Sequence, residues 1–239
     1  MQVVILAGGF GTRLSEETDV IPKPMVKIGN IPILRHIMNY YMKYGHSDFV
    51  IALGYKSEVI FEYFSELKVS EPALEWNVTL VDTGLHTLTG GRIKKLEDFL
   101  EDQFMLTYGD GLSNVNLLLL LEQHQASQKI ATLTAVHPPA RFGTIQVENG
   151  LVTKFAEKDP GDAGWINGGF FCMSKEICSF IDGDNISLEA EPLEKLVAMN
   201  QLGAYEHSGW WQPMDTLRDK KTLESIWSEN KVPWLMDKI

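Results

Sequence analysis

The first half of this 239-residue chain alternates short apolar segments with longer segments of helical period, and this alternation is the strongest constraint on its fold. Apolar runs predict strands at 2–6, 48–53, 76–81 and 104–108. Helical spacing of apolar residues predicts helices at 32–44, 56–67 and 115–124. Strands separated by helices predict a parallel sheet that is covered by helices on both faces.

The second half of the chain changes character and favours antiparallel strands. Its apolar runs predict strands at 130–137, 143–147, 152–157 and 166–173, and Asn149-Gly150 is a strong hairpin signal between the middle two. Helical segments follow near 189–200 and 217–228. Because no repeat or linker interrupts the chain, we expect one α/β domain over 1–239, with a mixed, mostly parallel central sheet and added antiparallel strands.

Composition excludes several classes of partner. The net charge of −11 argues against nucleic acid, because phosphate backbones reward a basic surface, although a few cations in one cleft can still hold a small anion. No apolar run approaches the roughly 20 residues of a membrane span, and the N-terminus has no secretory signal. The two cysteines, Cys172 and Cys178, have neither redox nor zinc spacing. We therefore expect reduced, packed thiols and a cytoplasmic protein that contacts no membrane.

The glycine-rich stretch LAGGFGTRL, residues 6 to 14, follows the first expected strand directly. A dinucleotide fingerprint needs a third glycine where this chain has Leu14, and no P-loop motif occurs. Glycines let backbone N–H groups approach a phosphate closely, and Arg13 can add a bidentate contact. The stretch alone is equally compatible with ordinary turn chemistry.

A second short motif, Pro22-Lys23-Pro24-Met25, places one lysine between two prolines. The prolines fix the backbone on both sides of the lysine. A lysine that must reach a phosphate benefits from such a frame, whereas a solvated lysine does not. A stiff loop with an incidental lysine remains the alternative.

LAGGFGTRL followed by PKPM resembles the signature of the sugar-1-phosphate nucleotidyltransferases, and further motifs resemble the glucose-1-phosphate cytidylyltransferase branch of that family. These motifs are VDTG at 81–84, TGGR at 89–92, TYGDG at 107–111, EK at 157–158, NGGFF at 167–171, EPL at 191–193 and WQPMDT at 211–216. The resemblance implies a Rossmann-like three-layer nucleotidyltransferase (GT-A-like) fold. It further implies a nucleotide-binding part over 1–110 and a sugar-phosphate-binding part over 111–239.

The implied reaction is Mg²⁺-dependent transfer of CMP from CTP to glucose 1-phosphate, giving CDP-glucose and pyrophosphate. Two anions must meet, so positive charge and metal dominate the catalysis, and the ionised acceptor phosphate needs no general base. By resemblance, Arg13, Lys23, Asp110 and Asp215 are catalytic. Asp110 and Asp215 would ligate the metal, since carboxylates, phosphates and waters suit Mg²⁺.

The resemblance also assigns binding residues. The expected nucleotide-binding residues are Leu6, Ala7, Gly8, Gly9, Gly11, Thr12, Arg13, Lys23, Thr83, Gly84, Gly90, Arg92 and Asp110. The expected sugar-phosphate-binding residues are Tyr108, Gly109, Glu157, Lys158, Asn167 and Gly168. From the residues alone, three alternatives stay open: Asp110 as a turn aspartate, Asp215 as a helix N-cap, and Glu157-Lys158 as a surface charge pair.

Two departures from the branch bear on function. The segment 65–75 is shorter than in relatives, where it lies near subunit contacts, and we expect a homo-oligomer whose size this segment puts in doubt. Leu188-Glu189-Ala190 stands where relatives have Trp-Glu-Gln, so an aromatic near the sugar is lost. The alternatives are a different nucleotide or phosphorylated acceptor, a non-catalytic nucleotide-sugar-binding subunit, and an NAD-binding oxidoreductase.

Overall fold

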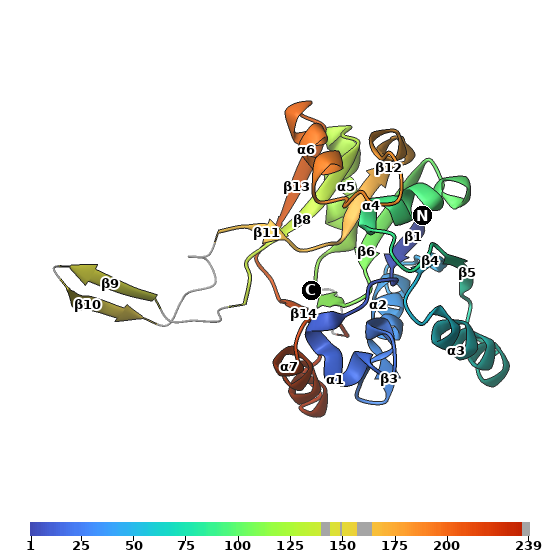
Figure 1. Cartoon of the computed structure of the whole chain (residues 1–239), viewed down its shortest axis with the longest axis horizontal. Coiled ribbons are helices and arrows are strands. Elements are labelled where there is room, and N and C mark those ends of the chain that lie inside the picture. The colour runs from blue at the N-terminus through green and yellow to red at the C-terminus, as the bar shows by residue number, and fades with distance from the viewer. Residues whose placement is uncertain (140–143, 149, 157–163, 236–239) are drawn as a thin grey trace.

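The computed structural model of the chain describes residues 1–139, 144–148, 150–156 and 164–235 (Figure 1). Its centre is an eight-stranded sheet. Seven strands follow one another in the order β11 (Ile166–Asn167), β8 (Ala131–Val136), β12 (Phe171–Ser174), β6 (Gln103–Tyr108), β1 (Gln2–Leu6), β4 (Asp48–Leu53) and β5 (Asn77–Asp82), and β13 (Leu202–His207) pairs with the other side of β8. The expected mixed, mostly parallel sheet is confirmed. Among the described residues, no helix combines the length and the apolar character that crossing a membrane requires.

The parallel part of the sheet comes from the first half of the chain. Strand β1 (Gln2–Leu6) lies between β4 (Asp48–Leu53) and β6 (Gln103–Tyr108), and β5 (Asn77–Asp82) pairs with β4. Every residue of β1 is buried, which explains why residues 3–6 form a continuous apolar run. The carboxyl ends of β1 and β6 meet at one edge, where parallel sheets commonly bind ligands.

Antiparallel strands extend the sheet on the β6 side. Strand β12 (Phe171–Ser174) pairs with both β6 and β8 (Ala131–Val136), and β11 (Ile166–Asn167) pairs with β8. The single strand expected at 166–173 is therefore two strands, because Gly169 and Phe170 take φ values of +77° and +49° between them. Strand β13 (Leu202–His207) pairs in parallel with β8 and was not predicted.

Helices cover both faces of the sheet, so the molecule has three layers (Figure 1). Val3 and Ile5 pack on one side with α2 (Ile33–Met42) and α5 (Leu117–Ser127). On the same side lie α3 (Ser57–Ser70) and α7 (Leu217–Ser228). Val4 and Leu6 pack on the other side with α4 (Thr89–Lys95) and α6 (Glu191–Ala198). The alternation along β1 thus separates two hydrophobic cores.

Smaller elements complete the chain. They are η1 (Thr12–Leu14), α1 (Ser15–Thr18), η2 (Lys23–Met25), β2 (Lys27–Ile28), β3 (Ile31–Pro32), η3 (Glu97–Phe99), β7 (Gly111–Ser113), η5 (Lys175–Phe180) and β14 (Trp211–Pro213). Strands β9 (Thr144–Glu148) and β10 (Leu151–Ala156) form a separate antiparallel ladder, and the Asn149 of its predicted turn lies outside the described residues.

Both cysteines are free and buried, as the sequence predicts. Burial raises the pKa of the Cys172 thiol to about 12 and that of Cys178 to about 11. Neither thiol is therefore a nucleophile near neutral pH.

Candidate active site

A short antiparallel ladder brings two distant carboxylates together. Strand β7 follows Asp110 and pairs with β14, which precedes Asp215, with Gly111 opposite Pro213. The backbone N–H of Met214 also donates to the carbonyl of Asp110 at 2.8 Å. Two residues that are far apart in the chain thus lie at the carboxyl end of β6.

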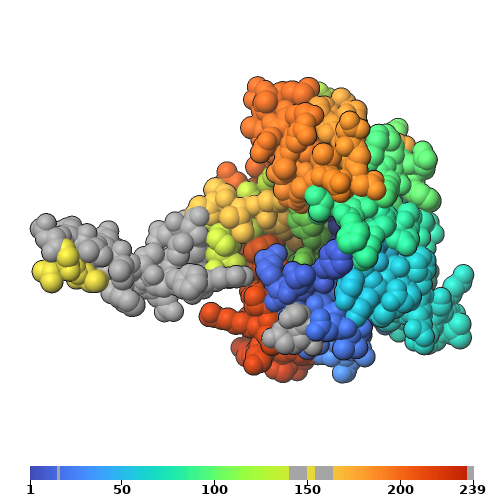
Figure 2. Space-filling view, viewed as in Figure 1, coloured from blue at the N-terminus to red at the C-terminus, as the bar shows by residue number. Residues whose placement is uncertain are grey.

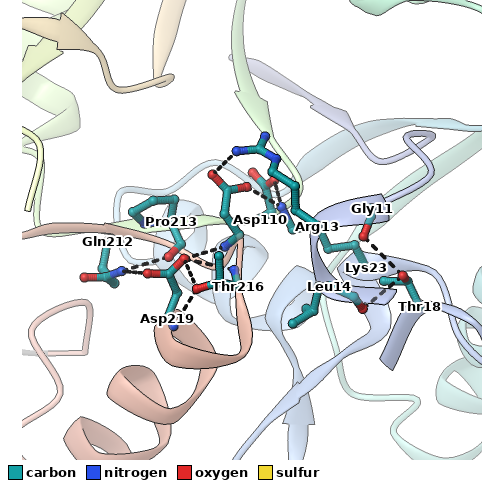
Figure 3. Close-up of polar contacts among 11 residues, drawn as sticks. Gly11, Arg13, Leu14, Thr18, Lys23, Asp110, Gln212, Pro213, Thr216 and Asp219 are labelled. Atoms are coloured by element: carbon teal, nitrogen blue, oxygen red, sulfur yellow. Dashed lines mark hydrogen bonds and ion pairs between the residues drawn. The ribbon is translucent and has the colours of Figure 1, made fainter. Parts of the chain in front are cut away.

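Lys23 lies between these two carboxylates (Figure 3). Its Nζ is 2.6 Å from Oδ2 of Asp110 and 2.7 Å from Oδ1 of Asp215. Its side chain is only 10% exposed. Burial by itself lowers the pKa of Lys23, but the Asp110 and Asp215 carboxylates outweigh it and raise the pKa above its ordinary value. The lysine is therefore a permanent cation at neutral pH.

The carboxylate of Asp215 is not used to cap the helix that follows. Thr216 is the N-cap of α7 and forms a capping box with Asp219. Oδ2 of Asp219 accepts from the backbone N–H of Asp215 at 3.1 Å, which fixes the backbone there (Figure 3). The Asp215 carboxylate is left to Lys23 and to Arg13, whose Nη1 lies 2.9 Å from Oδ2. The N-cap alternative for Asp215 is therefore wrong.

The three glycines of the loop after β1 serve different purposes. Gly11 takes φ +65°, a conformation that favours glycine. A Cβ at Gly9 would meet nothing within 4 Å, so this backbone is open to a ligand. Within the described chain, the N–H groups of Gly8, Gly9 and Phe10 have no acceptor. Such donors in a glycine-rich loop suit an anion.

Gly8 is glycine because a buried arginine lies directly beneath it. A Cβ on Gly8 would be 2.2 Å from Nη1 of Arg92. Arg92 is only 3% exposed, and its guanidinium donates to the carbonyls of Gly8, Leu53 and Gly84 at 2.8 to 2.9 Å. It also donates to Oγ1 of Thr83 at 2.6 Å. Arg92 is thus hydrogen-bonded to the carboxyl-terminal ends of β1, β4 and β5 or to the loops that follow them, and it fixes their relative positions.

These segments surround a cleft of about 430 Å³. The surface is hollowed where the N-terminal segment meets segments from later in the chain (Figure 2). The predicted site residues that line the cleft are Leu6, Ala7, Gly8, Gly9, Gly11, Thr12, Arg13, Lys23, Arg92, Tyr108, Gly109 and Asp110. Leu85 to Thr89 line it too.

Other predicted site residues lie behind this lining. Thr83 is fully buried and donates to the carbonyl of Leu53, and Gly84 offers its carbonyl to Arg92. Gly90 lies in α4, where a Cβ would be 2.8 Å from the carbonyl oxygen of Ile186. Glu157 and Lys158 lie outside the described residues.

A polar cluster adjoins the cleft at two of its lining residues, Tyr108 and Thr89. The hydroxyl of Tyr108 donates to Glu189, and it accepts from Nδ2 of Asn167 at 3.3 Å. Glu189 also accepts from Thr89 and Ser187. Glu189 is not among the predicted site residues, although the resemblance places its segment near the sugar. Its contacts with Thr89 and Tyr108 come from segments some 80 to 100 residues away, which local sequence does not reveal. The predicted pocket residue Gly168 lies nearby, and its carbonyl accepts from the Trp211 indole N–H at 2.8 Å.

The carboxylate pair fits the Mg²⁺ that the resemblance implies. Both carboxylates direct an oxygen at the one point where Lys23 now places a positive charge. The described residues contain no group of three His, Cys, Asp or Glu side chains arranged as metal ligands. Mg²⁺ commonly takes one or two protein carboxylates and completes its shell with waters and substrate phosphates, so two carboxylates are sufficient.

An α/β sheet edge that carries a glycine loop, a framed lysine and converging carboxylates defines a class of proteins that bind nucleoside phosphates. The chain matches the nucleotidyl transferase family model over residues 2–218. It therefore belongs to the nucleotidyl transferase family.

Curated relatives align over nearly the whole chain. It is 47% identical to a glucose-1-phosphate cytidylyltransferase of Salmonella typhi, with 98% of each chain covered. It is 40% identical to a probable glucose-1-phosphate cytidylyltransferase of Bacillus subtilis, with 98% of this chain and 99% of the relative covered. Among solved structures, HddC from Yersinia pseudotuberculosis complexed with GMP-PN has a TM-score of 0.72 at 24% identity and covers 95% of this chain and 99% of its own. That likeness confirms the nucleotidyltransferase fold.

Proposed function

We propose that this protein transfers CMP from CTP to glucose 1-phosphate, with Mg²⁺, and releases pyrophosphate. The observation that carries the proposal is the placement of Lys23 between Asp110 and Asp215 at the glycine-loop cleft. The names of the relatives at 47% and 40% identity support CTP and glucose 1-phosphate as the substrates.

The chemistry follows from the charges. An oxygen of the sugar phosphate attacks the α-phosphorus of CTP, the bond to the pyrophosphate oxygen breaks, and no proton has to be removed from the ionised nucleophile. The free N–H groups of Gly8 and Gly9 donate to phosphate oxygens. Arg13 and Lys23 offset the negative charge of the two reactants and of the leaving group.

Asp110 and Asp215 would hold Mg²⁺ in this proposal. When bound, the ion would offset phosphate charge and orient the triphosphate. Because Lys23 now holds both carboxylates, its ammonium must turn toward the phosphates when substrate enters. This exchange keeps the carboxylates paired in both states, which avoids the cost of an unpaired, partly buried charge.

The proposal is tested by measuring pyrophosphate release with Mg²⁺ for CTP, UTP, dTTP, ATP and GTP, each with glucose 1-phosphate. Release that strongly favours CTP is the expected result. Asp110→Asn should abolish most of it while the thermal transition remains cooperative. No release with any of the five nucleotides would contradict the assignment of glucose 1-phosphate, and a panel of other phosphorylated acceptors would then identify the substrate.

Three further expectations belong with this proposal. Residues 1–110 supply the nucleotide-binding part and 111–239 the sugar-phosphate-binding part of one domain, in which Glu157 and Lys158 bind the sugar phosphate. The two buried, unpaired cysteines support a reducing, cytoplasmic location. A homo-oligomer is the third expectation, and light scattering of the purified protein measures it.

A further inference from the structure

The polar cluster beside the cleft has an unusual composition for a site that must bind two phosphorylated substrates. Its centre is a carboxylate, that of Glu189, which comes just before α6. Oε2 of Glu189 accepts from Oγ1 of Thr89 at 2.7 Å and from Oγ of Ser187, and Oε1 accepts from the hydroxyl of Tyr108. In the part of the chain that the structure describes, no lysine or arginine forms an ion pair with Glu189.

Side-chain hydrogen bonds do not fill every acceptor position of the Glu189 carboxylate. Two carboxylate oxygens offer about four acceptor positions, and the described side chains fill three of them. Burial works to raise the pKa of Glu189, but hydrogen bonds from Ser187, Tyr108 and Thr89 outweigh it and hold the pKa below its usual range. Glu189 is therefore ionised at neutral pH, and its Oε1 accepts a hydrogen bond from one described side chain, that of Tyr108.

Asn167 provides a donor next to that acceptor. One N–H of its amide donates to the hydroxyl of Tyr108 at 3.3 Å, and its Oδ1 accepts from the backbone N–H of Gly169 at 3.0 Å. The second N–H of Asn167 has no acceptor among the described residues. A donor and an acceptor on the two sides of the Tyr108 hydroxyl match what a sugar hydroxyl needs, since it both donates and accepts.

The charges also give the cleft a direction. Lys23 and Arg13 lie at the glycine-loop end, and Glu189 lies at the Tyr108 end. The Tyr108 hydroxyl donates its one hydrogen bond to Glu189, so it cannot also donate to a phosphate. At the first end the two cations are offset by Asp110 and Asp215, whereas at the second end no described lysine or arginine pairs with Glu189. A phosphate is therefore repelled from the second end, and a neutral hydroxyl is favoured there.

From this geometry we infer that Glu189 selects the acceptor substrate by accepting a hydrogen bond from a ring hydroxyl of the sugar 1-phosphate, with Tyr108 and Asn167 beside it. The inference rests on the proposed function and adds the orientation of the sugar within that site. Thr89 and Ser187 act as positioning residues, because their donors hold the carboxylate in place.

The test pairs one substitution with a series of substrates. Glu189→Gln keeps the shape of the side chain and removes its charge. Glu191→Gln is the matched control, because the exposed carboxylate of Glu191 pairs with Lys195 on the surface of α6. The kcat/KM for the sugar is measured with glucose 1-phosphate and with its 2-, 3-, 4- and 6-deoxy analogues, together with the KM for CTP.

We expect Glu189→Gln to lower kcat/KM for glucose 1-phosphate by about 10- to 100-fold, the size of a hydrogen bond to a charged group. The KM for CTP should stay within about twofold, since uniform weakening of sugar binding leaves the nucleotide site intact. For one deoxy analogue the difference between wild type and variant should vanish, because the hydroxyl that Glu189 accepts from is missing. An equal loss with all five sugars would overturn the inference and leave Glu189 a support for Tyr108.

Two further measurements distinguish a bound hydroxyl from a bound cation, and sugar binding from turnover. Glucosamine 1-phosphate tests whether the carboxylate instead binds a cation: if the wild type prefers it over glucose 1-phosphate, the hydroxyl assignment is wrong. Calorimetry of glucose 1-phosphate binding to both proteins needs no turnover. If the wild type releases no pyrophosphate, the proposed function fails, whereas binding that depends on Glu189 still supports the inference.

Discussion

Replacing Lys23 by methionine tests whether the cation between the two carboxylates is needed for chemistry or only for stability. Methionine keeps most of the volume of the buried stem and removes the ammonium. Both charge-assisted hydrogen bonds are lost, at 2.6 Å to Asp110 and 2.7 Å to Asp215. The two carboxylates then face each other with no cation between them.

The cost to stability can be bounded from exposure. Hydrogen bonds to charged groups contribute about 1.5 to 3 kcal/mol each when buried. Asp110 and Asp215 are 31% and 18% exposed, so water can partly replace the ammonium, and we expect a loss of about 2 kcal/mol in total. For a domain of this size that corresponds to a fall in Tm of about 4 to 8 °C. Activity should fall more steeply, by at least ~10²-fold in kcat, the scale of one electrostatic contact to a transition state.

Two assays separate these effects. Pyrophosphate release gives kcat and KM for CTP, and differential scanning calorimetry gives Tm with and without Mg²⁺. Mg²⁺ should raise the Tm of Lys23→Met more than that of the wild type, because the vacated position between the carboxylates attracts a cation. Lys27→Met is the control, since Lys27 is an exposed lysine four residues away. A Lys23→Met protein with lower Tm and a kcat within threefold of wild type would refute the catalytic assignment.

Three other perturbations test the supporting structure. Gly8→Ala should lower activity, and it should lower Tm by a few degrees, because the added Cβ would clash with Arg92 at a cost of about 1 to 3 kcal/mol. Gly9→Ala is the control and should leave Tm unchanged, because a Cβ there meets nothing within 4 Å. Calorimetry compares the two variants. Burial lowers the pKa of His124 in the native protein. Between that pKa and about 6.5, the unfolded chain binds a proton that the native chain does not. The free energy of unfolding should therefore fall as pH drops through this window, by up to ~1.4 kcal/mol per pH unit. Urea unfolding at pH 7.5 and 5.5 measures this, and a slope that is unchanged in His124→Gln would contradict it. The thiol of Cys172 should react with a disulfide reagent only as fast as the protein unfolds, and rapid reaction of the native protein would show that the burial is wrong.

The sequence predicts the parallel strands well, because strands that are buried on both faces have recognisable runs of apolar residues. Strand β4 (Asp48–Leu53) has the predicted bounds, and β1 and β6 agree to within one residue. Such strands are buried on both faces, so nearly every position after the first is apolar and the run ends close to where the strand ends.

Elements that depend on distant backbone contacts could not be predicted in the same way. Helix α4 begins with Thr-Gly-Gly, a poor helical sequence, and it forms where Gly90 and Gly91 pack against the backbone carbonyls of Ile186 and Asp184. Strand β13 has the sequence LGAYEH, which lacks β-branched residues, and it forms by pairing along the whole length of β8.

For the site, the sequence identifies candidate residues more readily than it predicts the contacts that position them. The motifs single out Lys23, Asp110 and Asp215, and the structure places all three in contact. That Thr216 caps α7, while the Asp215 carboxylate pairs with Lys23 and Arg13, could not be read from adjacent residues, since both are good N-cap candidates. The resemblance placed the segment of Glu189 near the sugar, but the contact of Glu189 with Tyr108 joins residues 81 positions apart and could not be read from neighbouring residues.

The arginine beneath the glycine loop has a consequence for how the family can vary. A Cβ on Gly54 would lie 2.5 Å from Nη1 of Arg92, as one on Gly8 would lie at 2.2 Å. A lineage that keeps Arg92 should therefore keep both glycines. A lineage that exchanges the arginine for a short side chain is released at Gly8 only, because a Cβ on Gly54 would still lie 2.7 Å from the carbonyl oxygen of Gly8. Gly8 and Arg92 should therefore change together among descendants of a common ancestor, with the arginine first, because a side chain at position 8 would otherwise clash with the guanidinium, whereas Gly54 should stay glycine throughout.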